Sequence, residues 1–200
     1  TAMIALIGPV KRSCGFSRRT FAERMIESQP RYGEMMEVEV DTHVCGMLEF
    51  ESGVIGSLMM SFDIWDSMLP RLEIYGELGT LCLADPDPTD GTNIFGGQLL
   101  YKTRQTSRWE YRPRPQNREA WDLAENRHGY NEDSRGLGLA DLAYAVRDGR
   151  PPRASGEMAF HVFEIMMGIL DSPHDGVYNV LESSCDMPAP LPEDFPRSEG

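Results

Sequence analysis

The chain has 200 residues, of which 40% are hydrophobic, and this is enough to build the core of one domain. Its 19 basic and 32 acidic residues give a formal net charge of −13, which argues against binding to nucleic acid or to an anionic membrane surface. No apolar run approaches the roughly 20 residues that span a bilayer. The four cysteines are widely spaced without a CxxC pair, which favours a reducing environment, and we expect a cytoplasmic protein.

The chain begins with TAMIALIGPV, which has no initiator Met, no basic leader segment and no cleavage site. These residues are typical of the end of a helix, which Gly8 and Pro9 terminate. We therefore expect a piece of a longer protein. Residues 10–18 are predicted to form a strand, and residues 19–36 a connection.

Residues 37–64 predict a long antiparallel hairpin that turns at Glu51-Ser52-Gly53. Because side chains of a strand alternate between its faces, the even positions form one apolar face, which we expect to contact helices. The odd positions form a polar or mixed face, which we expect to be a subunit interface or pocket wall. The even face contains Val38, Val40, Val44, Leu48 and Phe50, with Val54, Leu58, Met60, Phe62 and Ile64 in the second strand; the odd face contains Glu39, Asp41, His43, Cys45 and Met47.

The rest of the chain predicts further strands, followed by two helices that close the core. The strands are expected at 71–75, 80–83, 98–102, 108–112 and 177–181. Leu139, Leu142, Ala143 and Val146 recur at helical spacing in the helix at 137–147. The second helix, at 157–170, is capped by Ser155 and is apolar nearly all round, so we expect it to be buried on more than one side.

This order of elements favours an α+β fold with an open, mostly antiparallel (mixed) sheet and helices packed on one face. We expect residues 1–192 to form one domain and residues 193–200 a C-terminal tail.

Few residues indicate chemistry. The chain contains no GxGxxG motif and no P-loop, so we expect no nucleotide site in it. His43 and Cys45 are two residues apart on one strand face, which suits a metal, but no second pair has matching spacing. We therefore expect no metal site and interpret His43 as an interface histidine. DPDPTDG at 85–91 indicates a turn-rich loop rather than a calcium loop, and His161 a hydrogen-bonded core histidine.

Three stretches carry a family resemblance over almost the whole chain, from Thr1 to about Pro192. They are THVCGMLEFESGVIGSL, PRLEIYGELGTL and RGLGLADLAYAVRDGRPPRASGEMAFHVFEIM. The chain resembles the C-terminal half of the glucose–fructose oxidoreductase / inositol dehydrogenase / rhizopine-catabolism (Gfo/Idh/MocA) family. The resemblance implies a domain similar to the C-terminal domain of glyceraldehyde-3-phosphate dehydrogenase (GAPDH). It also implies a substrate wall, and a homodimer or tetramer built through the sheet face.

The resemblance also implies what this chain lacks. In that family a separate N-terminal Rossmann domain binds NAD or NADP, and the catalytic lysine lies in a Glu-Lys-Pro motif. Lys11 and Lys102 are the only lysines here, and neither has that context. The family's catalytic Asp and His would precede Thr1, so we assign no catalytic and no cofactor-binding residue.

Two functional interpretations remain open from the sequence. The first is the substrate-binding and oligomerisation domain of an NAD(P)-dependent oxidoreductase that acts on a sugar, polyol or similar CH–OH substrate, inactive by itself. In this interpretation residues 62–65 and 129–136 form the substrate wall, and Trp65, Tyr130 and Arg135 border the pocket, because they lie at strand ends and at a helix start. The alternative is a non-catalytic homodimeric binding or assembly module.

Overall fold

The computed structural model describes residues 1–65, 67, 69–83, 99–103, 121–125, 136–175, 178–193 and 195, with only the backbone at 173–175. The chain divides into two compact units. Unit 1 combines Thr1–Trp65 with Gly138–Pro190, and unit 2 combines Asp66–Leu137 with Leu191–Gly200.

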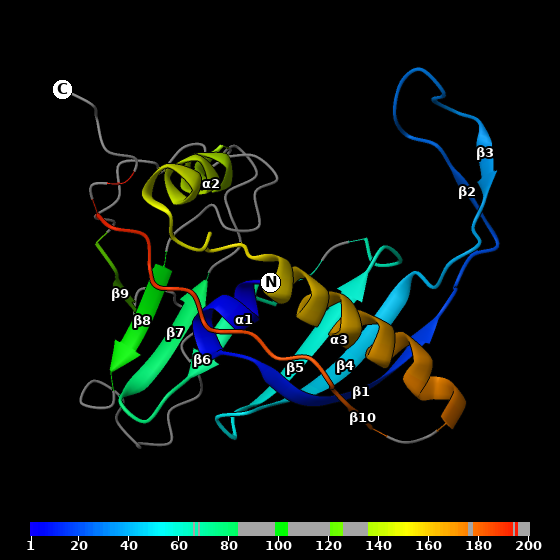
Figure 1. Ribbon diagram of the computed structural model, residues 1–200. Coiled ribbons are helices and arrows are strands. Elements are labelled where there is room, and N and C mark those ends of the chain that lie inside the picture. The colour runs from blue at the N-terminus through cyan, green and yellow to red at the C-terminus, as the bar shows by residue number, and fades with distance from the viewer. Residues whose placement is uncertain are drawn as a thin grey trace. The chain divides into compact units, whose positions relative to one another are not determined.

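Unit 1 is organised around a four-stranded sheet with the strand order β10-β1-β4-β5, in which every pairing is antiparallel (Figure 1). Its strands are β1 (Val10–Arg18), β4 (His43–Phe50), β5 (Ile55–Ser61) and β10 (Asn179–Val180). The short helix α1 (Ala2–Ile7) leads into β1 and ends at Gly8, whose φ of 105° suits a glycine. This confirms the helix end, the first strand and the β4–β5 hairpin that the sequence predicted.

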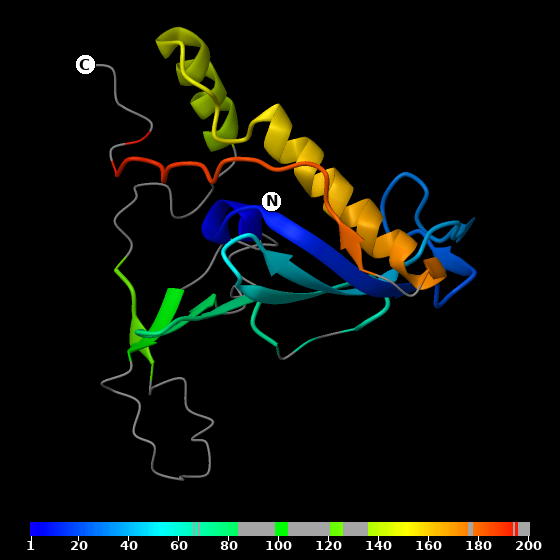
Figure 2. The same cartoon turned by 60° about the horizontal axis from the view of Figure 1, so that its bottom comes forward.

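Helix α3 (Gly156–Asp175) lies across one face of this sheet, as Figure 2 shows. The backbone N–H of Met158 donates to Ser155 Oγ over 3.2 Å, so the predicted N-cap is confirmed. The α+β fold with a helix on one face of an antiparallel sheet is confirmed as well. The core of unit 1 is formed by Ile4, Val10, Leu48, Phe50, Met158, Ile165 and Ile169.

Two glycines opposite each other in the sheet allow α3 to approach closely. Gly15 of β1 pairs with Gly46 of β4, and Ile169 of α3 lies over both. A Cβ atom at Gly15 would lie 2.7 Å from Ile169 Cγ2 and 2.5 Å from the Cys45 carbonyl oxygen. A Cβ atom at Gly46 would meet Ile169 Cδ1 at 3.0 Å. The even positions of β4 therefore face the helix, and the odd positions face away from it.

Polar side chains of α3 hold the chain segment that follows β10. His161 is fully buried; its Nε2 accepts a hydrogen bond from the Val10 backbone N–H over 2.9 Å, and its Nδ1 lies 2.8 Å from Ser183 Oγ. Glu164, one turn along, accepts from the backbone N–H groups of Glu182 and Ser183 and from the Ser183 hydroxyl. This confirms the prediction of a hydrogen-bonded core histidine. We call His161, Glu164 and Ser183 the polar seam.

Helix α2 (Leu137–Asp148) is anchored by a buried carboxylate. Asp141 Oδ1 lies 2.6 Å from Arg150 Nη2 and 2.5 Å from Arg153 Nη1, and Oδ2 accepts from the Arg153 backbone N–H over 2.8 Å. Burial alone would raise the pKa of Asp141, but these hydrogen bonds and ion pairs outweigh it and lower the pKa. Arg153 also donates to the carbonyl oxygens of Ala189 and Pro190. One carboxylate thus joins α2, the α2–α3 connection and the end of unit 1.

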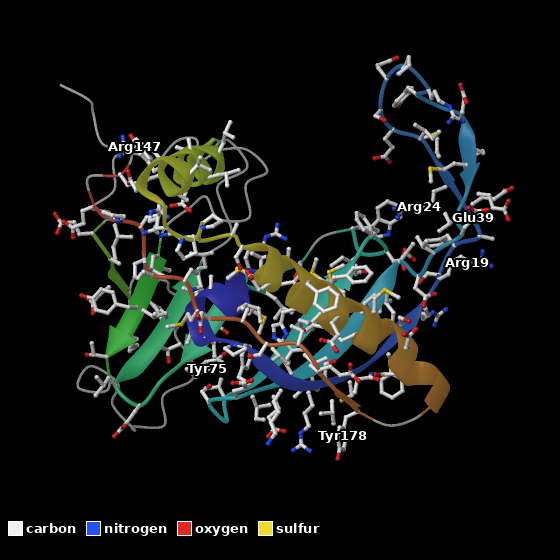
Figure 3. The ribbon with its side chains drawn as sticks, in the orientation of Figure 1. Arg19, Arg24, Glu39, Tyr75, Arg147 and Tyr178 are labelled. Carbon is white, nitrogen blue, oxygen red and sulfur yellow. The ribbon has the colours of Figure 1, made fainter. Side chains whose placement is uncertain are left out.

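The part of the chain that connects β1 to β4 forms a two-stranded arm, in which β2 (Glu23–Met25) pairs with β3 (Met35–Glu37). Figure 3 labels Arg19 and Arg24 at the base of this arm. Arg19 Nη1 donates to the Val38 carbonyl oxygen over 2.6 Å, which ties the two sides of the base together. Residues 19–36, predicted as a connection, therefore contain short strands.

Unit 2 contains a second antiparallel sheet with the order β6-β7-β8-β9. Its strands are β6 (Leu72–Tyr75), β7 (Gly79–Leu83), β8 (Leu99–Thr103) and β9 (Asp122–Leu123). The hairpin across residues 76–79 and the strand near 98–102 are confirmed. The loop at 85–91 and the strand predicted at 108–112 lie outside the described residues.

The extent of the predicted 37–64 hairpin was wrong. β4 begins at His43, because the residues before it belong to the arm and its base, and Val40 is 70% exposed. In the second strand only Leu58 joins the core, since α3 packs over β1 and β4 and leaves the edge strand β5 uncovered. The other apolar side chains predicted for this face are exposed; they are Val54, Met60, Phe62 and Ile64.

The burial predicted for the two helices was also wrong. Leu139, Leu142 and Val146 of α2 are exposed, and the buried residues of that helix are Asp141 and Ala145. The ion pairs of Asp141 hold this face inward, and hydrophobic periodicity does not detect them. α3 packs on one side only, so that Phe160, Phe163 and Met166 are exposed. No described helix has the length and apolar character to cross a membrane.

Candidate functional site

The predicted substrate wall includes the chain just past the end of β5, where Trp65 lies. Its side chain is 95% exposed, so the indole face is accessible to a ligand. Tyr130 and Arg135, predicted to border the same pocket, lie outside the described residues. The structure therefore places one of the three predicted residues, and their proximity stays a prediction.

A polar cluster lies beside Trp65, at the end of the β4–β5 hairpin. Thr42 Oγ1 donates to Asp63 Oδ2 over 2.7 Å, and the Asp63 backbone N–H donates to Ser61 Oγ over 3.1 Å. Arg24 Nη1, from the arm, lies 3.9 Å from Asp63 Oδ1. The Asp63 side chain is only 7% exposed, and Oδ1 has no hydrogen-bond partner among the described residues. We call Arg24, Thr42 and Asp63 the hairpin-end cluster.

The electrostatics of this cluster keep Asp63 ionised. The pKa of Asp63 is lowered most by a hydrogen bond from the Thr20 side chain and next by one from the Thr42 side chain. The positive charge of Arg24 adds to the effect. The Asp63 carboxylate is buried and lies close to Arg24, so in this conformation it holds the hairpin end together, whereas the exposed indole of Trp65, two residues along the chain, offers a flat apolar surface to a ligand.

The sequence pointed to residues 62–65 as a wall segment but missed Arg24 and Thr42 as their partners. These residues are separated from Asp63 by about 20 to 40 positions, and no motif links them. The signal that could have found Thr42 is register: His43 pairs with Ser61, which brings Thr42 opposite the end of β5.

The face of the unit 1 sheet opposite α3 carries the odd positions of β4 and their partners, and we call it the open face. Cys45 pairs with Phe16 of β1 and Met59 of β5, and Met47 pairs with Cys14 and Ser57. Arg12 forms an ion pair with Glu49 and stacks on the Tyr178 ring, labelled in Figure 3, at 4.7 Å. Several apolar side chains of this face are exposed: Phe16 at 78%, Ile55 at 62%, Val180 at 66%, Met47 at 47% and Met59 at 44%.

His43 and Cys45 contact each other on the open face. Cys45 Sγ lies 3.5 Å from His43 Nε2, and His43 Nδ1 lies 2.8 Å from Ser61 Oγ. All four cysteines lie in the described part of the chain, and none of them forms a disulfide bond. Within the described part of the chain, no three His, Cys, Asp or Glu side chains gather closely enough to hold a metal ion.

Comparison with known sequences gives a family match for the first part of the chain. Residues 1–82 match the family model described as the GFO/IDH/MocA C-terminal domain. These residues include the β4–β5 hairpin and the hairpin-end cluster. No curated protein sequence matches the chain.

Solved structures share the fold at low sequence identity. Levoglucosan dehydrogenase in its apo form superposes with a TM-score of 0.64 and 17% identity over 92% of this chain. An oxidoreductase from Agrobacterium radiobacter in complex with NAD+, L-tartaric acid and magnesium gives 0.55 and 11% over 89%. Aldose-aldose oxidoreductase from Caulobacter crescentus, complexed with glycerol, gives 0.53 and 18% over 90%.

This chain covers 49%, 45% and 44% of those three chains, so it spans about half of their length. At these identities the superpositions show the fold alone. The family match and the shared fold agree with each other and with the sequence resemblance. Residues 1–82, which are less than half of the chain, are therefore similar to the GFO/IDH/MocA C-terminal domain, and the chain shares its fold with these oxidoreductases.

Proposed function

We propose that this chain is the substrate-binding and oligomerisation part of an NAD(P)-dependent oxidoreductase that acts on a sugar, polyol or similar CH–OH compound. In the intact enzyme the carbinol carbon gives a hydride to the nicotinamide and its hydroxyl loses a proton. The nucleotide-binding domain and the catalytic lysine belong to a part of the protein outside this chain, and the chain by itself is inactive. We propose residues 1–192 as this domain and the cytoplasm as its location.

The hairpin-end cluster with Trp65 is the observation that carries the substrate class. Trp65 offers an open indole face, and the ionised Asp63 carboxylate, although buried, places a negative charge two residues away in the chain. Four of the structures that share the fold were solved with levoglucosan, L-sorbose, L-tartaric acid or glycerol, all of which carry hydroxyl groups. We extend the proposed pocket to Tyr130 and Arg135.

Self-association through the open face is the second part of the proposal. Its exposed apolar side chains would be buried against a second copy of the chain, as homodimers and tetramers require. On the open face Arg12 forms an ion pair with Glu49 and Arg18 is opposite His43, which limits the repulsion there between two copies of a chain with a net charge of −13. The same observation favours the alternative function, a non-catalytic homodimeric assembly module.

Kinetics of the intact protein separate these functions. We expect it to reduce NAD+ or NADP+ with at least one member of a panel of sugars and polyols, followed by the absorbance of the reduced nicotinamide. Trp65→Ala should raise KM several-fold and change kcat little, because a wall contact is equally strong in the ground and transition states.

Tyr32→Ala is the matched control, since Tyr32 is an exposed aromatic residue on the arm, and it should leave both constants unchanged. Reduction of neither cofactor with any member of the panel would favour the assembly module. If the enzyme is active and Trp65→Ala leaves KM unchanged, Trp65 is not part of the substrate wall.

A further inference from the structure

The open face gathers soft ligand atoms that the oxidoreductase function does not use. His43 and Cys45 are consecutive residues of this face on β4, and Met59 of β5 is directly opposite Cys45 in the strand register. Directly paired residues have Cβ atoms about 5 Å apart, and the three rotatable bonds of Met allow its sulfur to reach a neighbouring donor. An imidazole and a thiol therefore contact each other, and a thioether lies within reach of them on the neighbouring strand.

The two donors on β4 are already placed for a shared ion. Cys45 Sγ and His43 Nε2 are 3.5 Å apart. With bond lengths of the kind found at zinc, about 2.3 Å for a thiolate and about 2.0 Å for an imidazole nitrogen, two ligands of one ion are roughly 3.5 Å apart at a tetrahedral angle and about 3.7 Å apart at the trigonal angle of a three-ligand site. No rearrangement of the strand is needed to bring both ligands onto one ion.

The second ring nitrogen of His43, Nδ1, has a hydrogen-bond partner, as is usual for histidines that bind a metal. A metal bound at Nε2 leaves the ring proton on Nδ1, and a hydrogen-bond acceptor at Nδ1 fixes the tautomer and the ring orientation. Ser61 Oγ lies 2.8 Å from His43 Nδ1 and itself accepts from the Asp63 backbone N–H. The serine hydroxyl is thus held in place as the partner of the imidazole.

We propose that His43 Nε2, Cys45 Sγ and Met59 Sδ form a site for a soft monovalent metal ion, Cu(I) or Ag(I). Thiolate and thioether ligands select soft ions, whereas Zn²⁺ takes His, Cys and carboxylate ligands. The lack of any cluster of three His, Cys, Asp or Glu side chains in the described residues argues against a zinc site here. On binding, the Cys45 S–H proton goes to solvent, a metal–sulfur bond forms, and the oxidation state of the metal does not change.

Anaerobic titration of the 200-residue chain with Cu(I), in competition with bicinchoninate, tests this site. We expect one high-affinity Cu(I) per chain, with at least tenfold weaker binding in Cys45→Ser and Met59→Leu. Cys14→Ser is the matched control, because Cys14 lies on the same face, opposite Met47, but outside the three ligands, and it should bind like wild type. Equal loss in Cys14→Ser and Cys45→Ser, or unchanged affinity in Met59→Leu, would overturn the proposal.

A second measurement reads metal binding on the wild-type chain and uses a variant only to assign one signal. With methionine labelled at its methyl carbon, Ag(I) should shift one strong NMR signal of the wild-type chain, identified as Met59 by its absence in Met59→Leu. A shift of another methionine in place of Met59 would refute the site. Zn²⁺ should leave the Met59 signal in place, and a zinc-induced shift as large as that of Ag(I) would refute the soft-metal assignment.

Discussion

At the scale of single residues, Gly15 is the position where the packing of unit 1 leaves the least room for a side chain. An added Cβ atom would meet both the Cys45 backbone at 2.5 Å and Ile169 Cγ2 at 2.7 Å, whereas at Gly46 it meets the end of Ile169 at 3.0 Å. A backbone atom in the sheet ladder cannot move aside, but the end of a flexible side chain can rotate. We expect Gly15→Ala to lower the free energy of unfolding by about 1–3 kcal/mol, measured by urea denaturation.

Gly46→Ala is the control for this prediction, because it places the same methyl group under the same helix without the backbone clash. It should cost clearly less than Gly15→Ala. Equal losses in the two variants would mean that Ile169, rather than the strand backbone, limits the approach of α3.

Single residues also show where sequence reasoning ends. Alternation identified Leu48 and Phe50 as core residues, because they lie inside one regular strand. The same alternation failed at Val40, since the strand begins three residues later and the chain before it turns toward the arm. Asp63 and Thr42 could not be paired from the sequence, because their contact depends on the register of β4 against β5.

At the scale of elements, the polar seam decides how the chain after β10 is attached to α3. Burial is the largest influence on the pKa of His161 and lowers it. The imidazole is therefore neutral, and its Nε2 accepts a hydrogen bond from the Val10 backbone N–H. Ser183 is then the acceptor for the Nδ1 proton and also donates to Glu164. Two elements of the fold are therefore joined through one serine hydroxyl.

Ser183→Ala should lower the free energy of unfolding by about 1–3 kcal/mol, because it leaves the buried His161 N–H and a Glu164 oxygen without this partner. The neighbouring Ser184, whose hydroxyl donates to Glu51 in an exposed position, provides the control. Ser184→Ala should change stability by no more than about 0.5 kcal/mol. Urea denaturation measures both variants. Equal losses of stability would mean that the polar seam does not contribute specially to the stability of unit 1.

Element prediction succeeded where local signals are strong and failed where long-range contacts decide. Gly8, Ser155 and the glycines of the 76–79 turn mark boundaries by local chemistry, and each boundary is confirmed. The orientation of α2 depends on Asp141 meeting Arg150 and Arg153, a set of ion pairs that hydrophobic periodicity does not detect. The burial predicted for the apolar faces of α2 and α3 failed for the same reason, because their packing partners were inferred from composition and not from contacts.

At the scale of the whole molecule, the open face is where we predict a second copy of the chain. Phe16 is the most exposed of its apolar side chains, and burying a phenylalanine is worth about 1.5–3 kcal/mol. Phe16→Glu removes that contribution and also places a carboxylate in the contact. Because 1.4 kcal/mol corresponds to a factor of ten, we expect its dissociation constant to rise at least tenfold.

Light scattering across a concentration series measures this change: wild type should exceed the monomer mass, and Phe16→Glu should approach it. Phe163→Glu is the control, because Phe163 is 57% exposed on the outer side of α3, away from the sheet. It introduces the same charge and should leave the mass of the wild type unchanged. If Phe163→Glu dissociates the assembly and Phe16→Glu does not, the subunits meet through α3, and the open face is left for another role.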